Sequence, residues 1–234
     1  MLKGIKPMGL GKSIIFSIIP MILLFIAVNF YIPEYSSRFD PPILSWFLYG
    51  SVFVFVPMFV SSIILYKLER SGLTFKERFR LWSPRKNDLL VTIISIAAIS
   101  AVTFIIISIL TFFNSKFTVQ PFFMQMEPLK DGQLWVLLLW LPMFFFNIFG
   151  EAFFWRGYIY PRQEVYFGNF TWFAHGTCWM IFHLPFGSNL LIAVMPIIYI
   201  TSYAVQKTKN TYVDIIIHAV INGSGFLMIA LGVI

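Results

Sequence analysis

Long apolar runs separated by short polar connections set the pattern of this chain. Seven runs come close to or exceed the roughly 20 apolar residues that a membrane-spanning helix needs: 13–32, 43–66, 89–113, 134–159, 170–187, 189–205 and 211–234. The first follows a basic start, but its length and the lack of a small-residue cleavage site before Pro33 favour a retained helix over a signal peptide. We therefore predict an all-α, polytopic membrane bundle of about seven transmembrane helices, with residues 1–234 forming a single integral membrane domain.

Composition agrees with this prediction. Of the 234 residues, 59% are hydrophobic and only 12% are charged, whereas about a quarter of a soluble globular chain is charged. The single cysteine, Cys178, excludes a disulfide framework within the chain and a zinc site built from several thiolates.

The excess of basic residues predicts the orientation in the membrane. The chain has 17 Lys and Arg against 10 Asp and Glu. Positive residues mark the cytoplasmic side, and a cytoplasmic N-terminus places 14 of the 17 there: Lys3, Lys6, Lys12, Lys67, Arg70, Lys76, Arg78, Arg80, Arg85, Lys86, Arg156, Arg162, Lys207 and Lys209. We expect the C-terminus on the far side, and the cell membrane as the location if the organism is prokaryotic.

The 67–88 connection mixes charged with apolar residues and is the long polar segment of the sequence. This pattern is typical of an amphipathic segment that lies on anionic lipid headgroups. The expected partner of the basic residues is therefore the lipid bilayer, and no nucleic acid.

Ionisable residues inside the predicted spans indicate where chemistry takes place, because such residues are costly in a membrane and usually face the bundle interior. They lie in the fourth, fifth and seventh runs, with two asparagines as uncharged companions: Asn147, Glu151, Arg156, His175, His183, Asp214, His218 and Asn222. Residues 134–225 are thus expected to hold the catalytic core helices.

Helical spacing groups these side chains further. Asp214, His218 and Asn222 follow each other at intervals of four, which places them on one stripe of a helix. Asp214 either fixes the tautomer of His218 or supplies a favourable negative charge at a helix N-terminus. Asn147 lies one turn before Glu151. His175 matches no motif, and packing or a supporting role is expected for it.

A carboxylate, two imidazoles and an amide in a water-containing cavity have the right chemistry to hydrolyse a peptide bond. A glutamate can take a proton from water, and His218 with Asn222 can donate hydrogen bonds to an oxyanion. Other intramembrane protease designs fit the sequence less well. None of the histidines begins the H-E-x-x-H helix of a zinc protease, and Ser224, the candidate serine nucleophile, lies on the opposite helix face from His218. An aspartic protease needs two aspartates in the membrane, and Asp214 is the lone aspartate in a span.

Three motifs give the sequence a resemblance to the CPBP intramembrane proteases, also called Abi or CAAX-protease-like, which include the type II CAAX prenyl endopeptidases. That family carries E-E-x-x-x-R, F-x-x-x-H and H-x-x-x-N on successive helices. Here the motifs read EAFFWR from Glu151 to Arg156, WMIFH from Trp179 to His183 and HAVIN from His218 to Asn222.

The resemblance implies a role for each matching residue. By it, Glu151 is the water-activating glutamate, His183 is its partner, and His218 and Asn222 stabilise the oxyanion. For Arg156 we expect a structural role. One glutamate and two histidines also suit a catalytic zinc ion, but direct water activation without a cofactor is favoured, because the resemblance assigns His218 to the oxyanion. The implied substrate is a membrane-associated protein or peptide precursor, prenylated in part of the family, cleaved in a cavity open to the cytoplasmic leaflet.

Ala152 departs from the family pattern, which has a second glutamate at this position. A glutamate there would pair with Arg156 at i, i+4, so Arg156 is expected to lack that partner. This motivates an alternative function, a proteolytically weak or inactive family member that acts as a membrane partner or immunity protein. A proton-coupled transporter is disfavoured, because the sequence shows no internal repeat or broken-helix pair.

Overall fold

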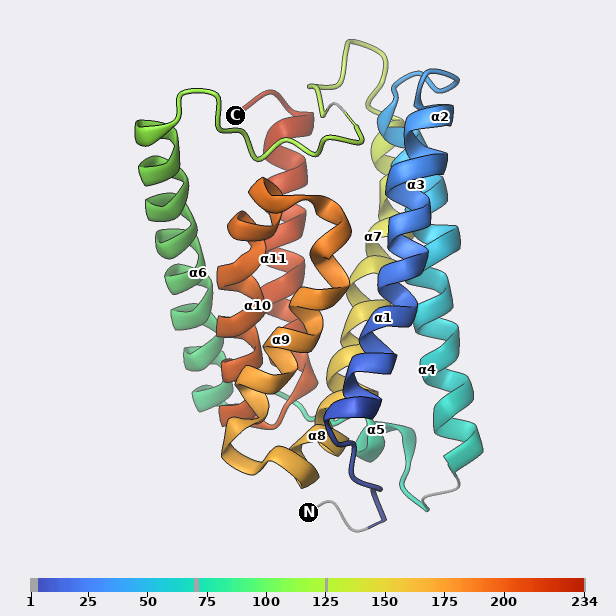
Figure 1. Cartoon of the computed structure of the whole chain (residues 1–234), viewed down its shortest axis with the longest axis vertical. Coiled ribbons are helices and arrows are strands. Elements are labelled where there is room, and N and C mark those ends of the chain that lie inside the picture. The colour runs from blue at the N-terminus through green and yellow to red at the C-terminus, as the bar shows by residue number, and fades with distance from the viewer. Residues whose placement is uncertain (1–3, 70–71, 125, 234) are drawn as a thin grey trace.

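Long helices running roughly side by side form the bundle in Figure 1. This computed structural model describes residues 4–69, 72–124 and 126–233, so two of the basic residues used for orientation, Lys3 and Arg70, lie outside the described part. All-α architecture is confirmed, since the chain is 78% helical and the described residues contain no strand.

The elements follow one another in this order: α1 (Leu10–Ile26), η1 (Ala27–Tyr31), α2 (Ile32–Ser36), α3 (Ile43–Gly50), η2 (Ser51–Phe55), α4 (Val56–Glu69), α5 (Phe75–Arg78), α6 (Lys86–Phe113), α7 (Val136–Glu151), η3 (Ala152–Ile159), α8 (Tyr160–Phe167), η4 (Gly168–Phe170), α9 (Thr171–His183), η5 (Leu184–Phe186), α10 (Ser188–Thr208) and α11 (Thr211–Ala230). Elements η1, η2 and η3 are π-helical, and η4 and η5 are 3-10 turns.

Among the described residues, six helical stretches are long and apolar enough to cross a membrane. They coincide with the seven predicted runs except that the fourth and fifth runs fall within one stretch, Val136–Phe186. This stretch reverses direction at Gly168, whose φ of 55° suits glycine, so that α7 and α9 are separate helices of the bundle (Figure 1). The multi-pass membrane architecture is therefore as predicted.

Elements α7, η3 and α8 form a continuous rod that is buried over its middle part. Every residue of η3 is buried, as expected for a helix that is surrounded by others on all sides. Helix α6, in contrast, has only 11% of its most apolar window buried and packs on α10 and α11 at the periphery. Its exposed Phe104 and Phe112 are positioned to face lipid.

One end of the bundle carries α5, α8 and the turn between α10 and α11 (Figure 1). We call it the basic end, after Arg78, Arg80, Arg162 and Lys209. The opposite end carries residues 114–124 and 126–135, and we call it the loop end. Helix α1 begins at the basic end and α11 finishes at the loop end.

The 72–85 segment differs from the amphipathic surface segment expected from the sequence. Thr74 and Glu77 form a capping box that starts α5, and Phe79 is then fully buried under η3. The guanidinium of Arg78 pairs with Glu69 at 2.8 Å and that of Arg80 with Glu164 at 2.5 Å. Burial lowers the pKa of Arg78 to about 10, so it stays charged at neutral pH. This segment therefore folds into the bundle and closes the basic end.

Candidate active site

Glu151 lies at the end of α7 with both carboxylate oxygens occupied by N–H donors. The side-chain amide of Asn147, one turn earlier, donates to Oε1 at 3.0 Å. The indole N–H of Trp179, on α9, donates to Oε2 at 2.9 Å. The residue is only 3% exposed. Two neutral donors from two helices therefore fix the orientation of this buried carboxylate.

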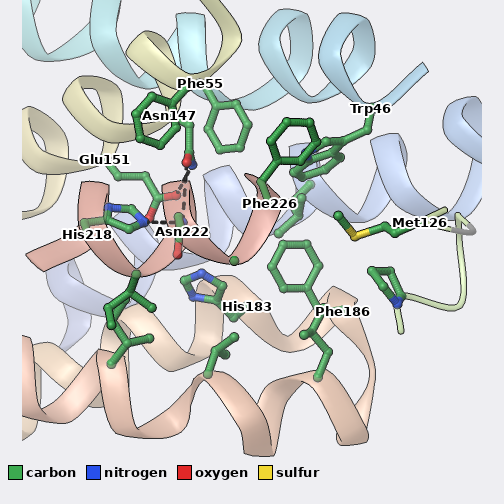
Figure 2. A pocket seen from close by; sticks show the side chains of 18 of the residues that line it. Trp46, Phe55, Met126, Asn147, Glu151, His183, Phe186, His218, Asn222 and Phe226 are labelled. Carbon is green, nitrogen blue, oxygen red and sulfur yellow. Dashed lines mark hydrogen bonds between the residues drawn. The ribbon is translucent and has the colours of Figure 1, made fainter. Parts of the chain in front are cut away.

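His218 and Asn222 lie side by side on α11, as their spacing predicts. The amide nitrogen of Asn222 is 2.8 Å from Nε2 of His218 and 3.5 Å from Oδ1 of Asn147. Figure 2 shows these groups gathered with Glu151 at one end of a cavity. His218 is 3% exposed, whereas Asn222 is exposed. The chain of contacts from Glu151 through Asn147 to Asn222 and His218 joins α7 to α11.

His183, the last residue of α9, faces the same cavity. Its Nδ1 lies 2.8 Å from the carbonyl oxygen of Trp179, so Nδ1 carries the proton and donates. No hydrogen bond joins His183 to Glu151 within the described residues, and the ring of Trp179 contacts the ring edges of both His183 and His218 at centroid distances of 5.4 and 5.9 Å.

Arg156 points into the protein and finds its acidic partner on another helix. Its Nε lies 2.9 Å from Oδ1 of Asp214, and the two side chains are 0% and 1% exposed. The guanidinium also stacks on the indole of Trp179, with Cζ 3.6 Å from the ring centroid. Asp214 lies in the first turn of α11, but Nδ1 of His218 has no partner, so Asp214 does not fix the tautomer of His218 through a hydrogen bond.

The π-helical η3 explains why Arg156 comes so close to the site. In a π-helix each turn contains about one more residue than in an α-helix, with hydrogen bonds from i to i+5. The N–H of Tyr160 accordingly bonds to the carbonyl of Trp155. Arg156, five residues after Glu151, therefore lies about one wide turn below it, whereas α-helical geometry would rotate it away. Ala152 is fully buried beside Phe79 and Ile215.

The cavity extends from these polar groups toward the loop end. Its volume is about 360 Å³, and Figure 2 shows its aromatic wall. The apolar lining comes from several elements and includes Leu24, Trp46, Phe55, Phe123, Met124, Met126, Trp140, Phe186, Val194 and Phe226. Among the described residues no lining residue belongs to α5 or α8. The cavity thus reaches away from the basic end.

The described residues contain no group of three or more His, Cys, Asp or Glu side chains arranged to hold a metal ion. The ligand set considered for zinc from the sequence, Glu151 with His183 and His218, is not such a group; each of the three instead contacts Trp179. The residues present do not fit that ion, and no step below is assigned to it.

His175 belongs to a separate buried cluster between α8 and α9. Its Nδ1 lies 2.6 Å from the side-chain oxygen of Gln163, whose amide nitrogen contacts the sulfur of Cys178 at 3.6 Å. The ring packs against Trp155 and Tyr160. His175 does not line the cavity, and its surroundings are those of a packed core residue.

Sequence reasoning treated Trp179 only as a substitute for the phenylalanine of the motif. In the structure it is the side chain that links Glu151, Arg156 and both cavity histidines. A signal for this was available, because a buried tryptophan usually needs a hydrogen-bond partner for its N–H.

An all-α membrane bundle with a buried carboxylate, two imidazoles and an amide around an apolar cavity has the features of an intramembrane peptidase. Residues 133–224, which hold all of these groups, match the family model described as Rce1-like, Type II CAAX prenyl endopeptidase Rce1-like. The match covers less than half of the chain, and over these residues the resemblance drawn from the three motifs is confirmed. Neither a curated protein nor a solved structure matches the chain.

Proposed function

We propose that this chain is an intramembrane endopeptidase that hydrolyses a peptide bond of a membrane-associated protein or peptide precursor. The family match supports a protease-like enzyme. The observation that carries the proposal is the placement of Glu151, a carboxylate held by two N–H donors at the polar end of an apolar cavity, beside His218 and Asn222.

In the proposed reaction Glu151 takes a proton from a water molecule, and the resulting hydroxide attacks the carbonyl carbon of the scissile bond. Each carboxylate oxygen keeps a lone pair beyond the one that accepts from Asn147 or Trp179. His183, whose Nδ1 is bound to a backbone carbonyl, has Nε2 left to hold the water. Glu151 then passes its proton to the leaving nitrogen, which gives a free carboxylate and an amine.

His218 and Asn222 are assigned to the oxyanion that forms during attack. At present the side-chain amide of Asn222 donates to Nε2 of His218 at 2.8 Å. When a substrate carbonyl oxygen replaces that contact, Asn222 donates to it directly, and His218 donates from Nε2 in the tautomer that carries its proton there. Preorganised donors in a site with little water stabilise such a charge by several kcal/mol, about 2.7–4 for one donor.

The apolar walls of the cavity favour a substrate with an apolar part next to the scissile bond. A prenyl chain and a row of large apolar side chains both meet this requirement, so the substrate is a prenylated protein or an unmodified peptide precursor. We place the basic end in the cytoplasm, because positive residues mark that side, and in a prokaryote the chain would lie in the cell membrane.

Purified protein in lipid nanodiscs tests the proposal with two probes, a farnesylated peptide with a CAAX-type C-terminus and the same peptide without the lipid. We expect the wild-type chain to cleave at least one probe and Glu151→Gln to abolish cleavage. Glu34→Gln, the same change at an exposed position of α2, serves as the control and should cleave like the wild type.

Three results would overturn the proposal. Cleavage that survives Glu151→Gln would exclude the assigned base. A wild-type chain that cleaves neither probe would favour the non-proteolytic membrane partner suggested by Ala152. Proton flux into proteoliposomes that requires Glu151, without cleavage, would favour a transporter.

A further inference from the structure

The buried charge of Arg156 requires a compensating charge, and the motif residue that would provide it is absent. An isolated guanidinium inside a membrane protein is very costly unless it is paired. With alanine at position 152, the acid next to Arg156 is Asp214, 2.9 Å away on α11, and solvent reaches neither side chain. The negative charge that faces Arg156 therefore comes from a neighbouring helix.

We propose that Asp214 is a positioning residue that takes over the role of the missing second glutamate of the E-E-x-x-x-R motif, by neutralising Arg156 and thereby holding Trp179 and Glu151 in place. This rests on the proposed function of Glu151. The line of contacts is direct: Asp214 pairs with Arg156, Arg156 stacks on the indole face, and the indole N–H holds Oε2 of Glu151.

The geometry of the Arg156–Asp214 pair indicates that Asp214 replaces the motif glutamate through its charge and not through hydrogen bonds. Although Nε and Oδ1 are 2.9 Å apart, neither the guanidinium nitrogens nor the Asp214 oxygens have a partner with hydrogen-bond geometry. Charge and the cation–π contact therefore hold Arg156. The unused donors are available to a carboxylate at position 152, four residues before Arg156 at the start of η3.

Asp214 connects two helices through its ion pair, which a glutamate at position 152 would not do. It lies four residues before His218 on α11, so its ion pair with Arg156 connects the helix of the oxyanion groups to the rod that carries Glu151. A pair formed within one helix cannot do this. In this chain the same ion pair that neutralises Arg156 also sets the position of His218 and Asn222 relative to the base.

The test relocates the carboxylate. We expect Asp214→Asn to lower kcat on the order of 100-fold with little change in KM, because misplacing a reacting group by about 1 Å has an effect of that size. The double variant Asp214→Asn with Ala152→Glu should regain at least tenfold, while Asp214→Asn with Ala152→Gln, of equal size but uncharged, should not. Ala152→Glu alone should not exceed the wild-type rate.

Asp88→Asn is the matched control. Asp88 is also buried, and it caps α6 and accepts from Asn210, far from the cavity. Its loss should lower the thermal unfolding temperature but leave kcat of the folded protein unchanged. If Asp214→Asn leaves kcat unchanged, or if the glutamate and glutamine double variants are equally inactive, the proposal is wrong.

A failure of the proposed function would be separate from a failure of this inference. If the wild-type chain cleaves nothing, the unfolding temperatures still test the charge exchange: Asp214→Asn should lower the value, and only the double variant with Ala152→Glu should raise it again. Cleavage that appears only with Ala152→Glu would show that the chain is a peptidase in which Asp214 does not replace the glutamate.

Discussion

The indole of Trp179 contacts Glu151 with its N–H and Arg156 with its face. A phenylalanine, the residue of the family motif, would keep a face for Arg156 but would leave Oε2 of Glu151 without a donor. The tryptophan thus connects the glutamate to an arginine whose charge is balanced from another helix.

At the level of this residue, Trp179→Phe should lower kcat by about 10- to 100-fold. A hydrogen bond to a charged group contributes roughly 1.5–3 kcal/mol, and 1.4 kcal/mol corresponds to about a factor of ten in rate. Cleavage of the better peptide probe measures the effect. Trp82→Phe, at a half-exposed ring near the basic end, should have no effect, and equal rates for both variants would contradict the role of the indole N–H.

The sequence predicted the contacts of a site residue only where its partner lies on the same helix. The pairing of His218 with Asn222 and of Asn147 with Glu151 followed from a spacing of four. The pairing of Arg156 with Asp214 did not, because it depends on which faces of η3 and α11 meet and on a π-helical turn that no local pattern in EAFFWR indicates.

Helices of the bundle approach closely where glycine removes a side chain. At Gly150, next to the proposed base, a Cβ atom would lie 2.6 Å from the carbonyl oxygen of Phe55 in η2. The obstacle is backbone, which cannot rotate away as a side chain can. The position of α7 against η2 therefore depends on this glycine.

Gly150→Ala should destabilise the protein by about 1–3 kcal/mol, the usual effect of overpacking, and should reduce cleavage because Glu151 moves with α7. Thermal unfolding in detergent measures the first effect. Gly11→Ala is the control, since a Cβ atom there meets nothing within 4 Å in α1. An unfolding temperature for Gly150→Ala equal to that of the control would refute the close approach.

The 72–85 segment, which contains α5, is anchored to the bundle by the side chain of Phe79. This ring is fully buried against Phe75 and Phe153 and fills the space that Gly157 leaves open in η3. The apolar runs in the sequence predicted the long helices well. They did not predict this inward fold, since Phe79 stands among charged residues and reads as part of a surface segment.

Phe79→Ala should cost about 3–5 kcal/mol of stability, the range for buried aromatic residues, and should loosen η3 below Ala152. The comparison is Phe112→Ala on α6, whose ring is 83% exposed and which should unfold at the wild-type temperature. If the two variants unfold together, the 72–85 segment does not close the basic end in the way described.

The whole molecule separates its charges between two ends. The basic end holds a network in which Glu69 pairs with Arg78 and Arg162, and Glu164 pairs with Arg80 and Lys209. The arrangement of helices makes the two ends distinct but does not assign a compartment to either; that assignment rests on the positive charges.

Cysteine labelling tests the orientation of the whole chain. The native Cys178 is buried, so a membrane-impermeant maleimide should not react with it. Lys116→Cys, at the loop end, should be labelled in intact cells, and Lys76→Cys, at the basic end, only after permeabilisation. The reverse pattern would place the basic end outside the cytoplasm.

The π-helical turn also makes the chain sensitive to length more than to side-chain identity. Removing one residue between Glu151 and Arg156 would rotate all that follows in the rod by about a quarter of a turn, so Arg156 would leave Trp179 and Asp214. Because the rod continues through α8, Arg162 and Glu164 would turn away from Glu69 and Arg80 as well. We therefore expect related sequences to show no insertions or deletions between the glutamate and the arginine.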